Sequence, residues 1–279
     1  MRNRGSRTRG SGLNRGLVWG AGIALAAVAT LTAYSALTGN DDHNNPSASQ
    51  SESASPASPG TFSPGTSTPQ AAPSYTAPGS WTEPLRWLAL PRGTKNGADG
   101  TQTGWPDTTD GAVALLVAAS TTNMQGSHGM VDQQMAIYNN YLAAADQSPA
   151  NAEKIKASAA KTDANSRSDL GLPASGPLPS GAFVRANVVG FRIIESSPSE
   201  VTAYLLTKVS QKAGETAPLK DSYVVSVLGA SWQDTDWKLS TKASAHAVAQ
   251  TQGQQQPAIA SPGDVAFNDA GWTAIRQAS

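Results

Sequence analysis

Residues 16–37 form one apolar run, GLVWGAGIALAAVATLTAYSAL, that contains no charged residue and no proline. A helix rises about 1.5 Å per residue, so this run spans roughly 33 Å, enough for a hydrocarbon core of about 30 Å. A helix also satisfies its own backbone hydrogen bonds, which a lipid environment requires. Trp19 and Tyr34 lie near the two ends, where interfacial aromatic residues are common. The run therefore predicts a transmembrane helix.

The charges on either side of this run predict its orientation. Residues 1–15 contain five arginines and no acidic residue, whereas Asp41 and Asp42 follow the run. The positive-inside rule places residues 1–15 in the cytoplasm as a basic tail, and everything after residue 38 outside. A cleaved signal peptide shares the basic start, but its apolar region normally has about 7–15 residues. We therefore expect an uncleaved anchor and a single-pass protein of the cell membrane.

Residues 38–80 have the composition of a disordered linker. Seven prolines and ten serines fall between residues 39 and 80, where Phe62 and Tyr75 are the only large apolar side chains. Such a segment cannot bury enough apolar surface to offset the entropy lost on ordering. We expect it to hold a domain, residues 81–279, away from the membrane.

That domain is long enough for one hydrophobic core, and its pattern changes from helical to strand-like along the chain. Three helices are predicted, the first capped by Thr108 or Thr109 and the third exposed: Asp110–Thr122, about Val131–Ala145, and Pro149 to about Lys161. Four strands follow, with a bulge expected at Gly190: residues 182–194, 201–210, 222–232 and Asp236–Ser240. Short connections, such as the turn at Gln233–Asp236, predict an antiparallel sheet and an α+β fold.

The two ends of this domain carry weaker patterns. Residues 81–105 read as irregular, and we expect Trp81, Trp87 and Trp105 to wrap the sheet or to contact a partner. The tail from Ala243 contains a glutamine-rich stretch and then a last segment with Phe267, Trp272 and Ile275, which is expected to dock on the core.

Two stretches resemble known proteins. TGWPDTTDGAVALLVAAS at residues 103–120 resembles a motif of uncharacterised actinobacterial single-pass membrane proteins, some of them encoded on integrative conjugative elements. SVLGASWQDTDWKLS at residues 226–240 resembles the hairpin of cystatin-like, nuclear-transport-factor-2-like domains, with Thr235 where that hairpin usually has glycine. The resemblance implies helices packed in the concavity of a curved antiparallel sheet, and a place in conjugative secretion machinery. It transfers no catalytic residue.

The residues themselves offer little chemistry. Cysteine is absent, which excludes disulfides, thiolate metal sites and a cysteine nucleophile. Beyond residue 15 the chain has fifteen basic and 20 acidic side chains, a balance that argues against binding nucleic acid. The three histidines, His43, His128 and His246, have no partner at metal-binding spacing and are expected at the surface.

Three further patterns have simpler explanations than catalysis. Ser158 and Lys161 match an SxxK spacing, but the SDN and KTG companions of penicillin-recognising enzymes are missing. Asp234 and Asp236 supply too few oxygens for calcium and suit a turn. Asp107 and Asp110 flank a helix start, where acidic groups are favourable. We therefore predict no catalytic, cofactor-binding or metal-binding residue and no enzyme activity.

These patterns lead to two functional hypotheses. The first is a non-enzymatic, membrane-anchored scaffold or adaptor of the cell envelope, a conjugative-transfer component in the sense of the resemblance, with other envelope proteins or itself as partner. It predicts an exposed apolar patch on the domain. The second is an extracytoplasmic module that binds a small ligand or a cell-wall fragment, which predicts a cavity with a few inward polar groups. Trp232 and Trp237, on either side of the hairpin turn, are expected in the core.

Overall fold

The computed structural model describes residues 79–97 and 100–276. The predicted basic tail (1–15), the transmembrane helix (16–37) and the linker (38–80, apart from Gly79 and Ser80) lie outside the described residues. Within the described ranges, no helix combines the length and the hydropathy needed to cross a bilayer.

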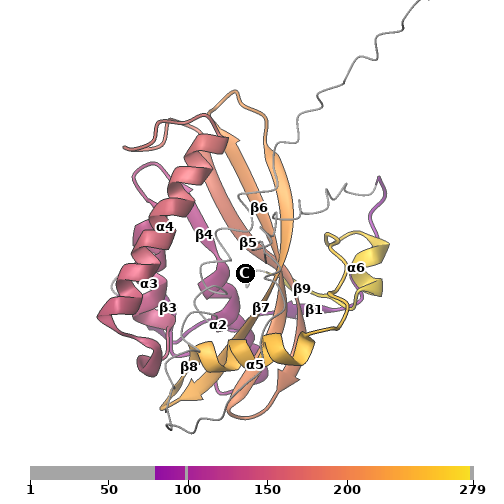
Figure 1. Cartoon of the computed structure of the whole chain (residues 1–279). Coiled ribbons are helices and arrows are strands. Elements are labelled where there is room, and N and C mark those ends of the chain that lie inside the picture. The colour runs from indigo at the N-terminus through magenta and orange to yellow at the C-terminus, as the bar shows by residue number, and fades with distance from the viewer. Residues whose placement is uncertain (1–78, 98–99, 277–279) are drawn as a thin grey trace, which may run out of the picture.

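One mixed sheet forms the centre of the described chain, and helices lie against it (Figure 1). Its strands run in the order β1-β9-β5-β6-β7-β8, while β4 pairs with the first half of β5 on the side that β9 occupies further along. The strands are β1 (Trp87–Ala89), β4 (Thr122–Gln125), β5 (Ala182–Ser196), β6 (Glu200–Ala213), β7 (Lys220–Gln233), β8 (Asp236–Leu239) and β9 (Thr273–Arg276). A separate antiparallel pair joins β2 (Lys95–Asn96) and β3 (Gln102–Thr103).

The antiparallel β5–β8 meander follows the sequence prediction closely. The register between β5 and β6 shifts between Val188 and Gly190, which confirms the expected bulge. The prediction of an entirely antiparallel sheet is wrong at the other edge, where β1 runs parallel to β9, with Trp87 opposite Ala274. No hairpin connects these two strands, since they come from opposite ends of the domain, so no short loop sets their direction.

The predicted helices are all present, and two more were not predicted. The elements are α2 (Thr109–Ser120), α3 (Met130–Tyr141), the 3-10 turn η1 (Ala144–Asp146), α4 (Pro149–Asp169), α5 (Thr241–Thr251) and α6 (Val265–Asp269). Thr122 belongs to β4 and not to the end of the first helix, and α4 continues past Lys161 to Asp169.

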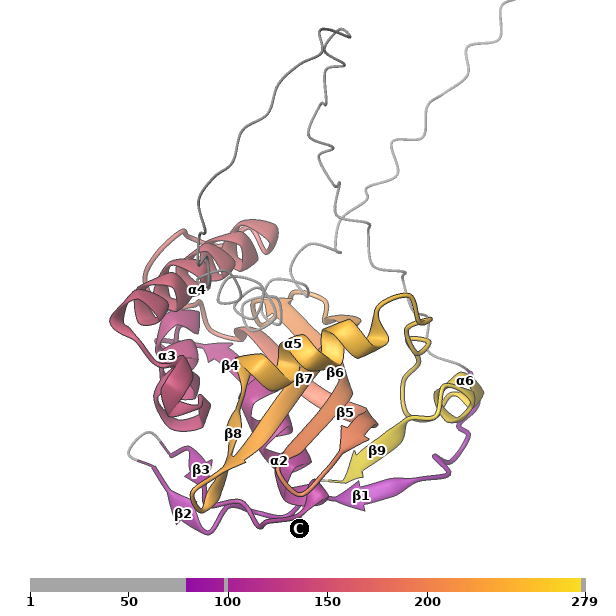
Figure 2. The ribbon, with the colours of Figure 1, turned by 60° about the horizontal axis from the view of Figure 1, so that its bottom comes forward.

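One face of the sheet, which we call the α2 face, is covered by α2, with α3 and α4 further out (Figure 2). Thr108 caps α2, since its Oγ1 accepts a hydrogen bond from the Gly111 N–H at 3.0 Å. Val113, Leu115 and Leu116 are completely buried. Burying three such side chains contributes several kcal/mol, at about 1.5–3 kcal/mol each. This packing makes α2 the centre of the main apolar core.

The opposite face, the α5 face, is covered by α5, α6 and the C-terminal segment (Figure 2). Gly229 on β7 allows α5 to approach, because a Cβ there would lie 2.5 Å from the Ala243 carbonyl carbon. Phe267 and Trp272 are buried on this face and pack against each other with ring centroids 6.5 Å apart. The expected docking of the last segment on the core is therefore confirmed.

Candidate functional site

The two stretches that carry the resemblance contact each other. The Trp105 N–H donates to Asp236 Oδ1 at 2.8 Å, and the Trp237 indole N–H donates to the Pro106 carbonyl oxygen at 3.0 Å. A Cβ on Gly111 would lie 2.0 Å from that same oxygen, so glycine is the residue that fits. These motif residues join the start of α2 to the β7–β8 hairpin. The contacts that these residues make in the structure are architectural.

The conformation of the hairpin turn accommodates threonine at position 235. Asp234 has the positive φ, 55°, and aspartate tolerates this conformation better than a β-branched residue does. Thr235 has no positive φ. The flanking tryptophans lie on one sheet face with ring centroids 5.4 Å apart, as the core prediction requires. Trp237 is fully buried, while Trp232 is half-buried against the same core.

The carboxylates considered for acid–base or metal chemistry have structural partners or lie in solvent. Asp236 binds the Trp105 N–H with one oxygen and Lys238 Nζ with the other, at 3.1 Å. Asp110 lies in the first turn of α2, and Asp107 is exposed beside it. Burial raises the pKa of the Tyr141 hydroxyl, and the Asp236 charge adds to this shift. A phenol with a raised pKa stays neutral near pH 7.

The other sequence candidates do not converge on a site. Ser158 and Lys161 lie on α4, where Lys161 is exposed. His128 is exposed in the turn after β4, as expected. In the part of the chain that the structure describes, no three His, Asp or Glu side chains come together in a way that would hold a metal ion.

His246 on α5 also lies at the surface, but it has an acidic partner. Its Nδ1 is 2.9 Å from Glu200 Oε1 at the start of β6. The hydrogen bond to Glu200 raises the pKa of the imidazole, and the charges of Glu200 and Glu195 add to the effect. The contact joins α5 to the sheet and has the geometry of a surface ion pair.

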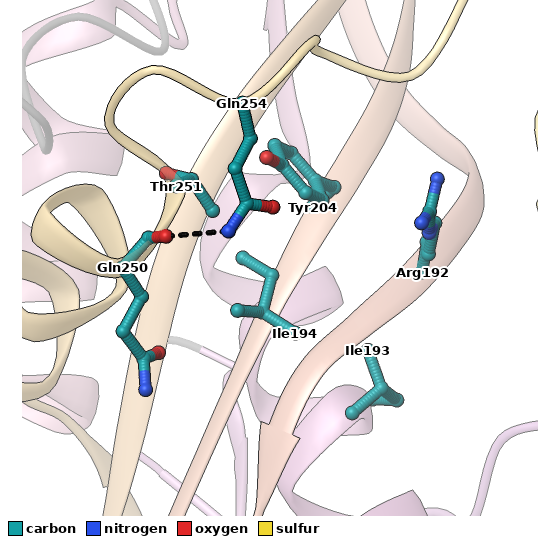
Figure 3. Close-up of a pocket in the computed structure, with 7 residues that line it drawn as sticks. All are labelled: Arg192, Ile193, Ile194, Tyr204, Gln250, Thr251 and Gln254. Carbon is teal, nitrogen blue, oxygen red and sulfur yellow. Dashed lines mark hydrogen bonds between the residues drawn. The ribbon is translucent and has the colours of Figure 1, made fainter.

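A pocket of about 380 Å³ opens on the α5 face (Figure 3). It lies where the end of α5 meets β5 and β6, and it is the candidate functional site. Tyr204 and Ile194 lie between Gln250 on one side and Arg192 on the other (Figure 3). The volume falls at the small end of the range for ligand pockets, about 300–1,000 Å³. Its full lining is Arg192, Ile193, Ile194, Tyr204, Gln250, Thr251 and Gln254.

Gln250 gives the pocket an unused hydrogen-bond acceptor. Its Nε2 donates to a carboxylate oxygen of Glu195, which only accepts hydrogen bonds, and this contact fixes the orientation of the amide. Its Oε1 is buried and has no hydrogen-bond partner. The Gln254 Nε2 donates to the Gln250 carbonyl oxygen at 2.7 Å (Figure 3). Gln250 Oε1 is thus a buried acceptor without a partner, on a residue that lines the pocket.

Arg192 and Arg86 gather positive charge at the other side. Arg86 Nη2 donates to the Gly271 carbonyl oxygen, and Arg192 Nη1 donates to the Ala270 carbonyl oxygen at 3.2 Å. A Cβ on Gly271 would lie 3.3 Å from Arg86 Nη2 and 4.0 Å from Arg192 Nε, so both side chains reach the same small region. Among the described residues, neither guanidinium forms a salt bridge. This arrangement favours an anionic group.

An exposed apolar surface lies beside α6, and we call it the α6 patch. It comprises Trp81, Leu85 and Val265, which are 64%, 83% and 56% exposed. The Thr82 N–H donates to the Gly263 carbonyl oxygen at 2.8 Å, and the Leu85 N–H donates to Asn268 Oδ1 at 2.8 Å. These bonds hold residues 81–85 along α6.

The first of these side chains is fixed in place. The Trp81 indole N–H donates to one oxygen of Glu83 at 3.0 Å, and the Trp87 indole N–H donates to the other at 2.9 Å. The Trp81 ring also covers Gly263, where a Cβ would lie 2.3 Å from it. Trp81 is thus an exposed aromatic side chain held by a hydrogen bond, whereas Trp105 is buried and Trp87 half-buried.

Sequence reasoning did not predict the pocket. Its lining comes from three elements, and one of them, α5, was not expected, because its sequence TKASAHAVAQT carries only small apolar residues and one valine. Arg192 lies directly opposite Tyr204 across β5 and β6, so the two side chains share a face of the sheet, a pairing that connects residues twelve positions apart. No protein-family model, curated protein or solved structure matches the chain. The function therefore rests on this chain's own residues.

Proposed function

We propose that this protein is a non-enzymatic adaptor of the cell envelope, anchored by residues 16–37 and carrying its folded domain outside the membrane. The observation that carries the proposal is the α6 patch. Exposed tryptophans fixed by their own hydrogen bonds are typical binding anchors, because little side-chain entropy is lost when a partner covers them. Of the five strongly exposed large hydrophobic side chains in residues 79–97 and 100–276, three belong to this patch.

The position of the patch in the chain supports the same function. Trp81 directly follows the linker. The transmembrane anchor (16–37) and the linker (38–80) would therefore confine the patch to within the linker's reach of the membrane surface. Tethering raises the effective concentration of the patch toward membrane-bound partners without any additional contact. The resemblance described above suggests conjugative transfer as the process in which the adaptor takes part. Its partner is then another envelope protein or a second copy of this chain.

Crosslinking in native membranes tests this proposal. A photoreactive phenylalanine analogue replaces Leu85 or Val265 in the full-length chain, and the matched control replaces Leu219, which is equally apolar and 55% exposed but outside the patch. We expect Leu85 and Val265 to give the same adduct and Leu219 to give none. Mass spectrometry then distinguishes a second copy from a different envelope protein.

A second variant shows whether the crosslinked adduct depends on the patch. Trp81→Ala removes the exposed indole ring from the patch and leaves the photoreactive residue at position 85 in place. The amount of adduct formed from position 85 should therefore fall severalfold. Equal adducts from Leu219, or an adduct that does not depend on Trp81, would contradict the adaptor proposal.

A further inference from the structure

The pocket on the α5 face has chemistry that an adaptor role does not use. Arg192 supplies a guanidinium at one side, Gln250 Oε1 supplies an unpartnered buried acceptor at the other, and Tyr204 with Ile194 lies between them (Figure 3). A ligand that satisfies all three needs an anionic group at one end, a hydrogen-bond donor at the other and an apolar side chain between them.

We propose that this pocket binds the C-terminal end of a short peptide. The peptide carboxylate pairs with Arg192, since a guanidinium matches a carboxylate with two parallel hydrogen bonds. A backbone N–H of the peptide donates to Gln250 Oε1, and a small side chain contacts Tyr204 and Ile194. The inference is independent of the α6 patch.

The charges around the pocket favour a ligand carboxylate at the Arg192 side and disfavour one at the Gln250 side. Arg86 reaches the same region as Arg192, and among the described residues no carboxylate neutralises either guanidinium. Glu195 lies on the Gln250 side and already accepts from the Gln250 amide. A ligand lying the other way round would place its negative charge toward Glu195, which is repulsive.

An inorganic anion fits less well than a peptide. Phosphate pairs with guanidinium groups, but it has no apolar part to contact Tyr204 and Ile194. A buried amide oxygen left without a partner costs free energy that a peptide N–H recovers. The pocket volume of about 380 Å³ accommodates a ligand of dipeptide size.

The test follows the Ile194 methyl resonance by NMR in the purified full-length chain, assigned with Ile194→Val. The probes are N-acetyl-alanyl-alanine, its C-terminal amide, and sodium phosphate. We expect a saturable shift with the free acid and about tenfold weaker binding of the amide, since one charge-assisted pair is lost. Phosphate is expected to bind at least tenfold more weakly than the acid.

Variants separate the pocket from general charge. Arg192→Gln is expected to weaken the acid about tenfold and to reduce its preference over the amide. The matched control is Arg185→Gln on the same strand, which lies over the Phe183 ring away from the pocket and should change nothing. Because Arg192 also holds the Ala270 carbonyl oxygen, a melting curve accompanies each variant.

Gln250→Leu provides a second readout that leaves Arg192 in place. It removes the acceptor, so the acid and the amide should both bind severalfold more weakly while the preference for the acid persists. Equal binding of acid and amide, equal loss in Arg185→Gln, phosphate binding as tight as the acid, or no shift at about 10 mM peptide would each overturn the proposal.

Discussion

The two faces of the sheet are covered by very different helices. On the α2 face, a helix rich in leucine, valine and alanine buries its large side chains against β5 to β8. On the α5 face, the helix contacts β7 and β6 mainly through alanine and serine, and it reaches them because Gly229 has no side chain. The second face has a pocket at the end of its helix.

This difference separates stability from recognition. Large buried apolar groups supply most of the free energy of folding, so we expect the α2 face to set the global stability. Small residues bury little area each, so α5 is expected to open locally at lower cost, whereas the buried Phe267 holds α6 to the sheet. The pocket is lined in part by this less strongly held helix.

The largest expected effect is that of Trp237→Ala. This residue is fully buried, packs edge-on against Trp232 and bonds the Pro106 carbonyl oxygen. Its loss should lower the free energy of unfolding by about 3–5 kcal/mol, measured by chemical denaturation. Trp232→Ala, at a half-buried position, is the matched comparison and should cost clearly less. Similar losses for the two would contradict the assignment of Trp237 to the core.

Gly229→Ala should act on the other face and more locally. The new Cβ would lie 2.5 Å from the Ala243 carbonyl carbon, so α5 must move away from β7. We expect a loss of about 1–3 kcal/mol and faster amide exchange in α5, with little change in α2. Gly214→Ala is the control, since its nearest neighbour would be 3.8 Å away. Uniform loss of protection across both faces would show that they unfold as one unit.

The same contrast explains what could be predicted from the sequence. The run AVALLVAAS and the cap at Thr108 are local signals, and so is the alternation along β6, so α2 and the meander were predicted within a few residues. The α4 helix was predicted too short, because the residues that it buries beyond Lys161 are polar, and so they form no apolar stripe: Thr162, Ser166 and Arg167.

The α5 face could not be predicted, because its contacts join distant parts of the chain. The parallel pair β1 and β9 brings Trp87 beside Ala274. No local sequence pattern near either residue indicates this pairing. Arg192 and Gln250 reach one pocket only because α5 crosses β6 and β7. The tryptophans near the start of the domain were expected to wrap the sheet or to contact a partner; Trp105 is buried and Trp81 is exposed, and the partner contact stays a prediction.

Two buried threonines on one strand allow the two faces of the sheet to be compared by substitution. Thr207 and Thr202 on β6 point to opposite faces, are fully buried, and have hydroxyl groups without a hydrogen-bond partner. Replacing an unpartnered hydroxyl with a methyl group removes a desolvation cost, so Thr202→Val should be neutral or stabilising by about 1 kcal/mol. Thr207→Val should behave in the same way.

A difference between these two variants would sharpen the comparison. If Thr207→Val destabilises the protein while Thr202→Val does not, the Thr207 hydroxyl has a polar partner in solution. Ser226 and Gln211 lie on the same face with unpartnered oxygens, and they would form the rest of that polar region. The ligand hypothesis would then extend to the α2 face.

The smallest expected effect is a pH dependence from His246, which ties α5 to Glu200 at the start of β6. The hydrogen bond to Glu200 raises the pKa of the folded imidazole above its usual value near 6.5. Its contribution is therefore complete below about pH 6.5 and is lost as the pH rises through the folded pKa. Denaturation of wild type and His246→Gln should differ slightly at about pH 5.5 and converge at about pH 8.5. Because the pair is exposed and screened, 1 M salt should remove the difference. A gap that persists at pH 8.5 would mean that His246 holds α5 by packing and not by charge.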